Sequence, residues 1–186
     1  MPSPSHRRRR ALASLIGAIL VVIPTGAARA HVSDTPQPTN VVTLAACPVD
    51  GSNEFVDDWG DARSGGRHHE GVDMVAERGT PVVAVRDGDA EFKRSNLGGN
   101  AIWLVSATGE RFYYAHLDRW EGSSRAVVAG EVIGYVGSSG NARGDHLHFE
   151  SHAGERPVNP YPLVERACRP SLENAPEAPA SRAMPR

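Results

Sequence analysis

The sequence predicts a mostly β protein, an antiparallel β-sheet domain with little helix. Short apolar segments follow one another with Gly, Asp and Asn between them, as in antiparallel sheets with tight turns. No long segment repeats apolar residues with the 3.6-residue period of an amphipathic helix. The 19 Gly and 14 Pro also favour turns and strands over long helices. A length of 186 residues suits one domain.

The expected strands end at turn residues. We expect strands within residues 80–85, 90–94, 101–106, 111–117, 127–128, 131–136 and 146–152, with a reversal at Gly98-Gly99. Residues 41–46 are either a first strand or the lead-in to a cysteine. The segment Asn159-Pro160-Tyr161-Pro162 is expected to close the domain with rigid turns.

The first 30 residues have the pattern of a signal peptide. Four arginines at positions 7–10 precede an apolar run over 11–23, and Ala28-Arg29-Ala30 is a small-x-small cleavage site. The run is too short to span a bilayer comfortably, so a cleaved signal is favoured over a retained anchor. Residues 8–12 loosely fit a twin-arginine signal, and a general secretory signal explains the arginines equally well. The sequence therefore predicts a secreted protein without a membrane span after cleavage.

The charge pattern does not indicate a nucleic-acid-binding protein. The formal net charge is −2, and loss of residues 1–30 would leave 15 basic and 22 acidic residues, a net charge of −7. Residues 31–46 are expected to form a linker. Residues 169–186 contain little to bury and are expected to be a disordered tail.

The two cysteines bracket the predicted domain, residues 47–168. In an oxidising compartment an even pair, Cys47 and Cys168, indicates a disulfide. The alternative is two free, buried thiols.

Two histidines lie on one face of the last long expected strand. Alternation places His146 and His148 on that face and turns Leu147 and Phe149 toward a core. Each imidazole needs a polar partner, and one ring could bind a metal while its neighbour moves a proton. A solvated strand face is the simpler alternative.

Two further segments carry candidate side chains. If residues 69–73 are extended, His69 and Asp73 share a face with Gly71 between them, which leaves that face open. A glycine turn between solvated polar residues would also explain the segment. In the strand expected over 111–117, alternation places His116 on the same face as Phe112 and Tyr114.

These side chains could form a metallohydrolase site. His69, Asp73 and His148 offer two nitrogens and one oxygen, a set that suits one zinc ion with an open position for water. His146 could take a proton and return it to the leaving amine. His116 could stabilise the oxyanion, and the roles of His116 and His146 could be exchanged.

At these positions the chain resembles the M23 (lysostaphin/LytM-type) zinc endopeptidases. Residues 69–73 resemble their His-x-Gly-x-Asp motif, and residues 146–150 are similar to their His-Leu-His-Phe-Glu motif. Linking motifs follow in family order: Gly-Thr-Pro-Val at 79–82, Gly-Asn at 99–100, Tyr-Ala-His-Leu at 114–117 and a glycine-rich stretch at 137–140. The resemblance extends from about Cys47 to Pro160.

The resemblance implies the lysostaphin/LytM-type fold and a secreted, monomeric zinc metalloendopeptidase. Its substrates would be the peptide cross-links or stem peptides of bacterial peptidoglycan. By position, His69, Asp73 and His148 would hold zinc, and His116 and His146 would be the catalytic pair. A non-catalytic wall-binding or hydrolase-activating protein on the same fold is the alternative, although all five site residues are present. His31, His68 and His152 receive no role.

One segment departs from the family pattern. Residues 142–145 read Ala-Arg-Gly-Asp, where the family usually has Ser-Thr-Gly-Pro. The spacing is kept, so the metal geometry should be intact. The lining of the groove changes, and Asp145 is expected to add negative charge beside His146. The sequence leaves open which bond is cut and whether a partner or propeptide gates activity.

Overall fold

The structure is a computed structural model that describes residues 42–169. The predicted signal peptide (1–30), most of the linker (31–46) and all but the first residue of the tail (169–186) lie outside the described residues, as does His31. Among the described residues, no helix is long and apolar enough to cross a membrane.

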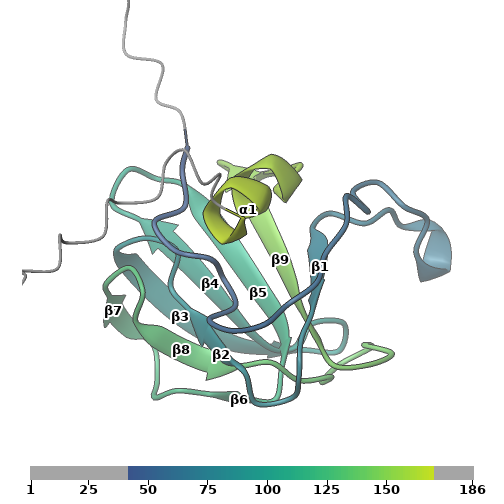
Figure 1. Cartoon of the computed structure of the whole chain (residues 1–186), viewed down its shortest axis with the longest axis horizontal. Coiled ribbons are helices and arrows are strands. Elements are labelled where there is room, and N and C mark those ends of the chain that lie inside the picture. The colour runs from purple at the N-terminus through teal and green to yellow at the C-terminus, as the bar shows by residue number, and fades with distance from the viewer. Residues whose placement is uncertain (1–41, 170–186) are drawn as a thin grey trace, which may run out of the picture. The chain divides into compact units, whose positions relative to one another are not determined.

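Two antiparallel sheets form the domain (Figure 1), as the sequence predicted. The large sheet has the order β1-β9-β5-β4-β3-β7, with β10 paired to β9, and the small sheet has the order β2-β8-β6. The strands of the large sheet are β1 (Val72–Val75), β3 (Gly88–Ser95), β4 (Gly99–Ser106), β5 (Arg111–Leu117), β7 (Arg125–Val127), β9 (His146–Ala153) and β10 (Arg156–Val158). Those of the small sheet are β2 (Pro81–Val83), β6 (Arg119–Trp120) and β8 (Val132–Tyr135).

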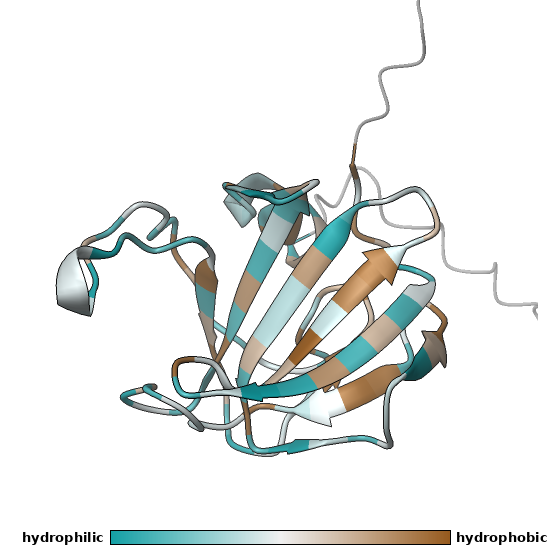
Figure 2. Ribbon diagram, turned by 180° about the vertical axis from the view of Figure 1, so that it is seen from behind, coloured by the Kyte–Doolittle hydropathy of each residue, from teal (hydrophilic) through white to brown (hydrophobic). Residues whose placement is uncertain are grey.

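The core is formed by alternate residues of the strands, which appear as teal and brown bands along the ribbons in Figure 2. Leu147 and Phe149 of β9 and Phe112 of β5 are fully buried. Burying one such side chain contributes roughly 1.5–3 kcal/mol. The alternation on β9 therefore leaves His146 and His148 on the opposite face, as predicted.

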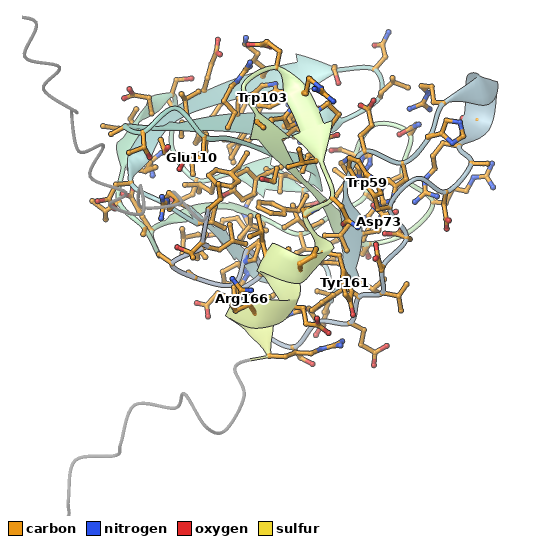
Figure 3. All side chains as sticks on the ribbon, turned by 90° about the horizontal axis from the view of Figure 1, so that it is seen from above. Trp59, Asp73, Trp103, Glu110, Tyr161 and Arg166 are labelled. Atoms are coloured by element: carbon orange, nitrogen blue, oxygen red, sulfur yellow. A yellow bond between two sulfur atoms is a disulfide. The ribbon has the colours of Figure 1, made fainter. Side chains whose placement is uncertain are left out.

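One short helix, α1 (Tyr161–Cys168), stands where the sequence suggested only turns. Pro162 lies in its first turn, where the missing N–H has no intrahelical partner to lose. Val164 anchors the helix because it is fully buried in the core. Eight residues with two flanking prolines give too little periodicity to indicate a helix, so the expectation of turns alone was wrong. Figure 3 shows Tyr161 and Arg166 of α1 on one side of the large sheet and Trp103 on the other.

The predicted disulfide is present. Cys47 is bonded to Cys168 at the end of α1, 121 residues later. Residues 42–46 form no strand; the backbone N–H of Ala45 donates to Val85 O as the segment leads into the bridge. A 3₁₀ turn, η1 (Ser64–Gly66), lies in the loop that projects beyond β1 (Figure 1).

Candidate metal centre and its groove

The pairing of β1 with β9 brings the two predicted motifs together. In this antiparallel register Asp73 lies opposite His148. Gly71 permits the approach: a Cβ there would lie 2.5 Å from Phe149 O and 2.8 Å from Cε1 of His148. The glycine between the candidate ligands thus provides room for the His148 ring, as its place in the motif suggested.

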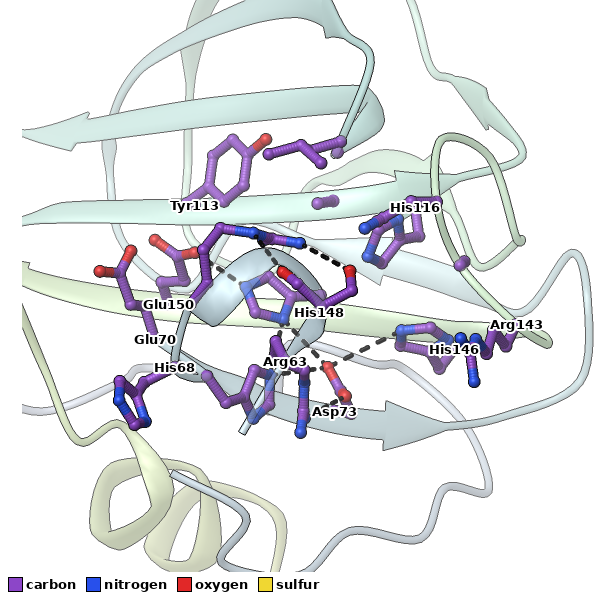
Figure 4. A pocket seen from close by; sticks show the side chains of 18 of the residues that line it. Arg63, His68, Glu70, Asp73, Tyr113, His116, Arg143, His146, His148 and Glu150 are labelled. Carbon is purple, nitrogen blue, oxygen red and sulfur yellow. Dashed lines mark hydrogen bonds and ion pairs between the residues drawn. The ribbon is translucent and has the colours of Figure 1, made fainter. Parts of the chain in front are cut away.

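Three donor atoms converge at this point (Figure 4). Nε2 of His69 lies 3.0 Å from Oδ1 of Asp73 and 2.9 Å from Nδ1 of His148, and the last two atoms are 3.0 Å apart. Tetrahedral zinc, with bonds of about 2.0–2.1 Å, places its ligand atoms roughly 3.3 Å apart. The spacing and the two-nitrogen, one-oxygen donor set therefore fit zinc.

Two further side chains of β9 hold His148 in place through hydrogen bonds. Its Nε2 donates to Oε1 of Glu150 at 2.8 Å, and Oε2 of Glu150 accepts from Nε2 of His152 at 2.6 Å. The sequence reasoning gave His152 no role and overlooked Glu150. Their spacing was the available signal, since residues 148, 150 and 152 of a strand share one face.

The other two candidate ligands are supported from the loop before β1. Nδ1 of His69 lies 3.0 Å from Asp58 O and 3.1 Å from its Oδ2. Arg63 donates to Oδ2 of Asp73 and to Oδ2 of Asp58, each at 3.0 Å. These contacts join residues five to eleven positions apart in an irregular loop. No sequence pattern indicated them.

The same contacts set the protonation of the centre without metal. Burial lowers the pKa of His69, but hydrogen bonds to Asp58 and Asp73 outweigh it and raise the pKa to about 9. Burial also lowers the pKa of His148, but hydrogen bonds to Asp73 and Glu150 outweigh it, so the pKa of His148 is raised. For Asp73, burial raises the pKa, and the bonds from both histidines hold it far below its usual range. The carboxylate is therefore ionised, and the raised pKa of His69 means that a metal must displace a proton from that ring.

His116 reaches the groove by a different backbone path from the one predicted. Its φ of 65° lies in the left-handed region, and the β4–β5 register shifts between Asn100 and Ile102. The alternation therefore breaks, and His116 does not share the core face with Phe112 and Tyr114. Tyr114 is fully buried, with its hydroxyl accepting from Val85 N. The expectation of a common face was wrong.

His116 and His146 face each other across the groove, with ring centroids 4.8 Å apart. Nδ1 of His116 lies 2.8 Å from Ser139 O, and Nδ1 of His146 lies 2.9 Å from Gly144 O. A ring nitrogen can bond a carbonyl oxygen only as a donor, so Nε2 of each ring is left for the groove. Burial lowers the pKa of His116 to about 4, helped by the neighbouring histidines.

The loop before β9 lines this end of the groove with Ala142 and Arg143. Asp145 instead forms an ion pair with Arg78 at 2.7 Å. Arg78 also pairs with Asp118 at 2.8 Å, so the negative charge expected from Asp145 beside His146 is directed to this arginine and Asp145 does not line the groove.

The groove has a volume of about 660 Å³ and contains all five predicted site residues. Tyr113 of β5 also lines it. His68 lies at its edge, exposed, with Nδ1 bonded to Gly60 O. The open groove can accept an extended chain beside the three donor atoms and the two free imidazole nitrogens.

Known proteins are similar to this chain in sequence and in fold. The model of peptidase family M23 matches residues 67–160. The DD-carboxypeptidase/endopeptidase Mpg of Neisseria meningitidis is 45% identical over 95 residues, which are 50% of this chain and 22% of that protein. The L-Ala–D-Glu endopeptidase of Bacillus subtilis is 35% identical over 132 residues, 62% of this chain and 40% of that protein.

A solved structure agrees with the fold. The catalytic domain of lysostaphin from Staphylococcus simulans superposes with a TM-score of 0.55 at 32% identity, covering 61% of this chain and 92% of that one. The chain thus spans less than half the length of the curated relatives named above but nearly all of an isolated M23 catalytic domain. Since the family model covers half of the sequence, including the motifs that form this site, the chain belongs to peptidase family M23.

Proposed function

We propose that this chain is a secreted, monomeric zinc metalloendopeptidase that hydrolyses peptide bonds in bacterial peptidoglycan. The observation that carries the proposal is the convergence of His69, Asp73 and His148 donor atoms within 3.0 Å beside a groove with two further histidines. Family membership supports peptidase chemistry. The names of the relatives, an L-Ala–D-Glu endopeptidase and a DD-carboxypeptidase/endopeptidase, support peptides of the cell wall as substrates.

Zinc held by His69, Asp73 and His148 would supply a polarised carbonyl and a water of lowered pKa. Asp58 and Glu150 would keep the two imidazoles oriented, since each accepts from the ring nitrogen that faces away from the metal. Arg63 would hold the second oxygen of Asp73 and so keep its Oδ1 toward the metal.

The two remaining histidines would move the protons. His116 would accept a proton, because burial keeps its ring neutral at pH 7 and its Nε2 is free. His146, whose ring lies opposite His116 and whose Nε2 is 3.7 Å from the Asp73 carboxylate, would stabilise the developing oxyanion. This exchanges the roles first expected from the sequence and leaves the residues unchanged.

The test is digestion of purified peptidoglycan by residues 31–186, with mass analysis of the released fragments. A chelator should abolish release and zinc should restore it. His148→Ala should lose both zinc and activity, because it removes a metal ligand. His116→Ala and His146→Ala should keep zinc and slow hydrolysis by about 10²–10⁴-fold. Glu155→Ala, at an exposed residue outside the groove, is the control.

The outcomes separate the two functions that the sequence left open. A zinc-loaded protein that binds peptidoglycan and releases no fragment would support the non-catalytic alternative. Wild-type rates in His116→Ala and His146→Ala would contradict the proton-transfer roles.

A further inference from the structure

The charged residues that line the groove differ in whether they have hydrogen-bond or ion-pair partners. They are three arginines and three carboxylates: Arg63, Arg67, Arg143, Glu70, Asp73 and Glu150. Asp73 and Glu150 bond to histidines, Arg63 bonds to Asp58 and Asp73, and Arg67 bonds to Ser64 of its own loop. Within residues 42–169, no hydrogen bond or ion pair engages Arg143, and the side chain is exposed.

Arg143 lies beside the proton-transfer histidine. It precedes His146 by three residues, and Figure 4 shows it on the side of His146 that faces away from Asp73. The carboxylate nearest in sequence, Asp145, is occupied by Arg78 at 2.7 Å. Arg143 therefore presents an uncompensated guanidinium at one end of the groove.

Glu70 lies toward the opposite end of the groove. In the β1–β9 register, Val75 pairs with His146 and Val72 with Phe149, so the residues before β1 lie toward the Glu150 end of the groove. Glu70 is exposed there, and Figure 4 shows it far from Arg143, near Glu150. The unpaired guanidinium of Arg143 and the exposed carboxylate of Glu70 thus lie toward opposite ends of the groove, with the candidate metal centre between them.

We propose that Arg143 forms a carboxylate-binding subsite, which selects peptides that bear a free carboxylate next to the scissile bond. This rests on the proposed peptidase function and deepens it. A guanidinium binds a carboxylate through two parallel N–H···O bonds, a geometry that an uncharged group does not match. A cross-link made through a diamino diacid keeps a carboxylate on the carbon beside the scissile nitrogen, whereas a glycine bridge has none. Arg143 therefore favours acidic stem-peptide cross-links over glycine bridges.

The test compares two synthetic cross-linked peptides that differ only in this group, one with the free carboxylate and one with the carboxamide. For the zinc-loaded mature chain, kcat/KM should favour the carboxylate by about 10- to 100-fold, the usual range for a hydrogen bond to a charged group. Arg143→Gln should reduce this ratio to about one, and Arg143→Lys should restore part of it. Arg156→Gln, at an exposed arginine outside the groove, should keep the wild-type ratio.

A wild-type ratio near one, or an unchanged ratio in Arg143→Gln, would overturn the subsite while leaving the peptidase function intact. If the wild type cleaves neither peptide nor whole peptidoglycan, the proposed function fails. In that case, calorimetry on the same proteins gives the dissociation constants of the carboxylate and the carboxamide peptide. Tighter binding of the carboxylate peptide by the wild type that is lost in Arg143→Gln supports the subsite. Equal dissociation constants for the two peptides in the wild type refute it.

Discussion

At the residue scale, His148 is held at both ring nitrogens. Nδ1 faces Asp73 and His69, while Nε2 donates to Glu150, which also accepts from His152. Burial raises the pKa of Glu150, but the bonds from the two histidines lower it more, so the group stays a carboxylate. A carboxylate that accepts the Nε2 hydrogen fixes the tautomer in which Nδ1 is free to bind a metal.

Removal of this carboxylate should weaken the metal site without removing a ligand. Glu150→Gln is expected to lower zinc affinity by about 10–100-fold, measured by competition with a chelating dye. The control is Glu155→Gln, an exposed residue paired with Arg111. Equal zinc affinity in Glu150→Gln and wild type would show that Glu150 does not orient His148.

Zinc binding should release protons. The pKa of His69 is raised from 6.5 to about 9, so at pH 7.5 the folded, metal-free protein holds a proton there that zinc displaces. Zinc affinity should therefore fall as the pH is lowered from 9. Calorimetry at pH 7.5 in two buffers of different ionisation enthalpy should give different heats, with fewer protons released by Asp58→Asn, which loses one cause of the raised pKa. Identical heats in both buffers would contradict this.

Each of the five proposed site residues belongs to a short motif, which is why the sequence alone could nominate them, and all five line one groove. Their supporting partners could not be identified in the same way. Arg63 and Asp58 meet the ligands only through the path of an irregular loop. Glu150 and His152 were within reach, since they continue the face of His148 along β9.

At the element scale, the alternation of apolar and polar residues predicted which face each side chain takes in the regular strands, but not at their irregular ends. Alternation gave the correct faces of β9, but it failed at the end of β5. There the left-handed backbone of His116 and a register shift turn the ring into the groove. Such a turn depends on the neighbouring loop: His116 N donates to Gly98 O, and its Nδ1 bonds Ser139 O. No local sequence pattern predicts these hydrogen-bond partners.

The approach of β1 to β9 makes a further prediction. Gly71→Ala places a Cβ against Phe149 O and the His148 ring, so the ring must move and zinc affinity should fall at least tenfold. Gly144→Ala is the matched control, because a Cβ there meets no atom within 4 Å. Zinc titration of both variants checks the difference. Wild-type affinity in Gly71→Ala would show that the strands can separate without cost to the site.

At the scale of the whole molecule, the disulfide joins the two ends of the described domain. Cys47 leads into the small sheet through the Val49–Val82 bridge, and Cys168 ends the helix anchored by Val164. Neither cysteine lies in the groove. The bridge therefore constrains the chain globally, while the candidate metal site lies on β1, β9 and the loops beside them. Such a bond also agrees with the predicted export, since disulfides persist in oxidising compartments.

Loss of the bridge should lower stability and spare the metal. Closing a loop of 121 residues contributes about 4–5 kcal/mol on the chain-entropy model. The Cys47→Ser/Cys168→Ser protein, and reduced wild type, should therefore melt at a lower temperature than the oxidised protein, measured by calorimetry in the presence of zinc. Below the melting transition both should bind one zinc with wild-type affinity, because no ligand is altered. Loss of zinc at a temperature where the variant is still folded would show that the bridge positions His69, Asp73 or His148, and equal melting temperatures would show that α1 is held by packing alone.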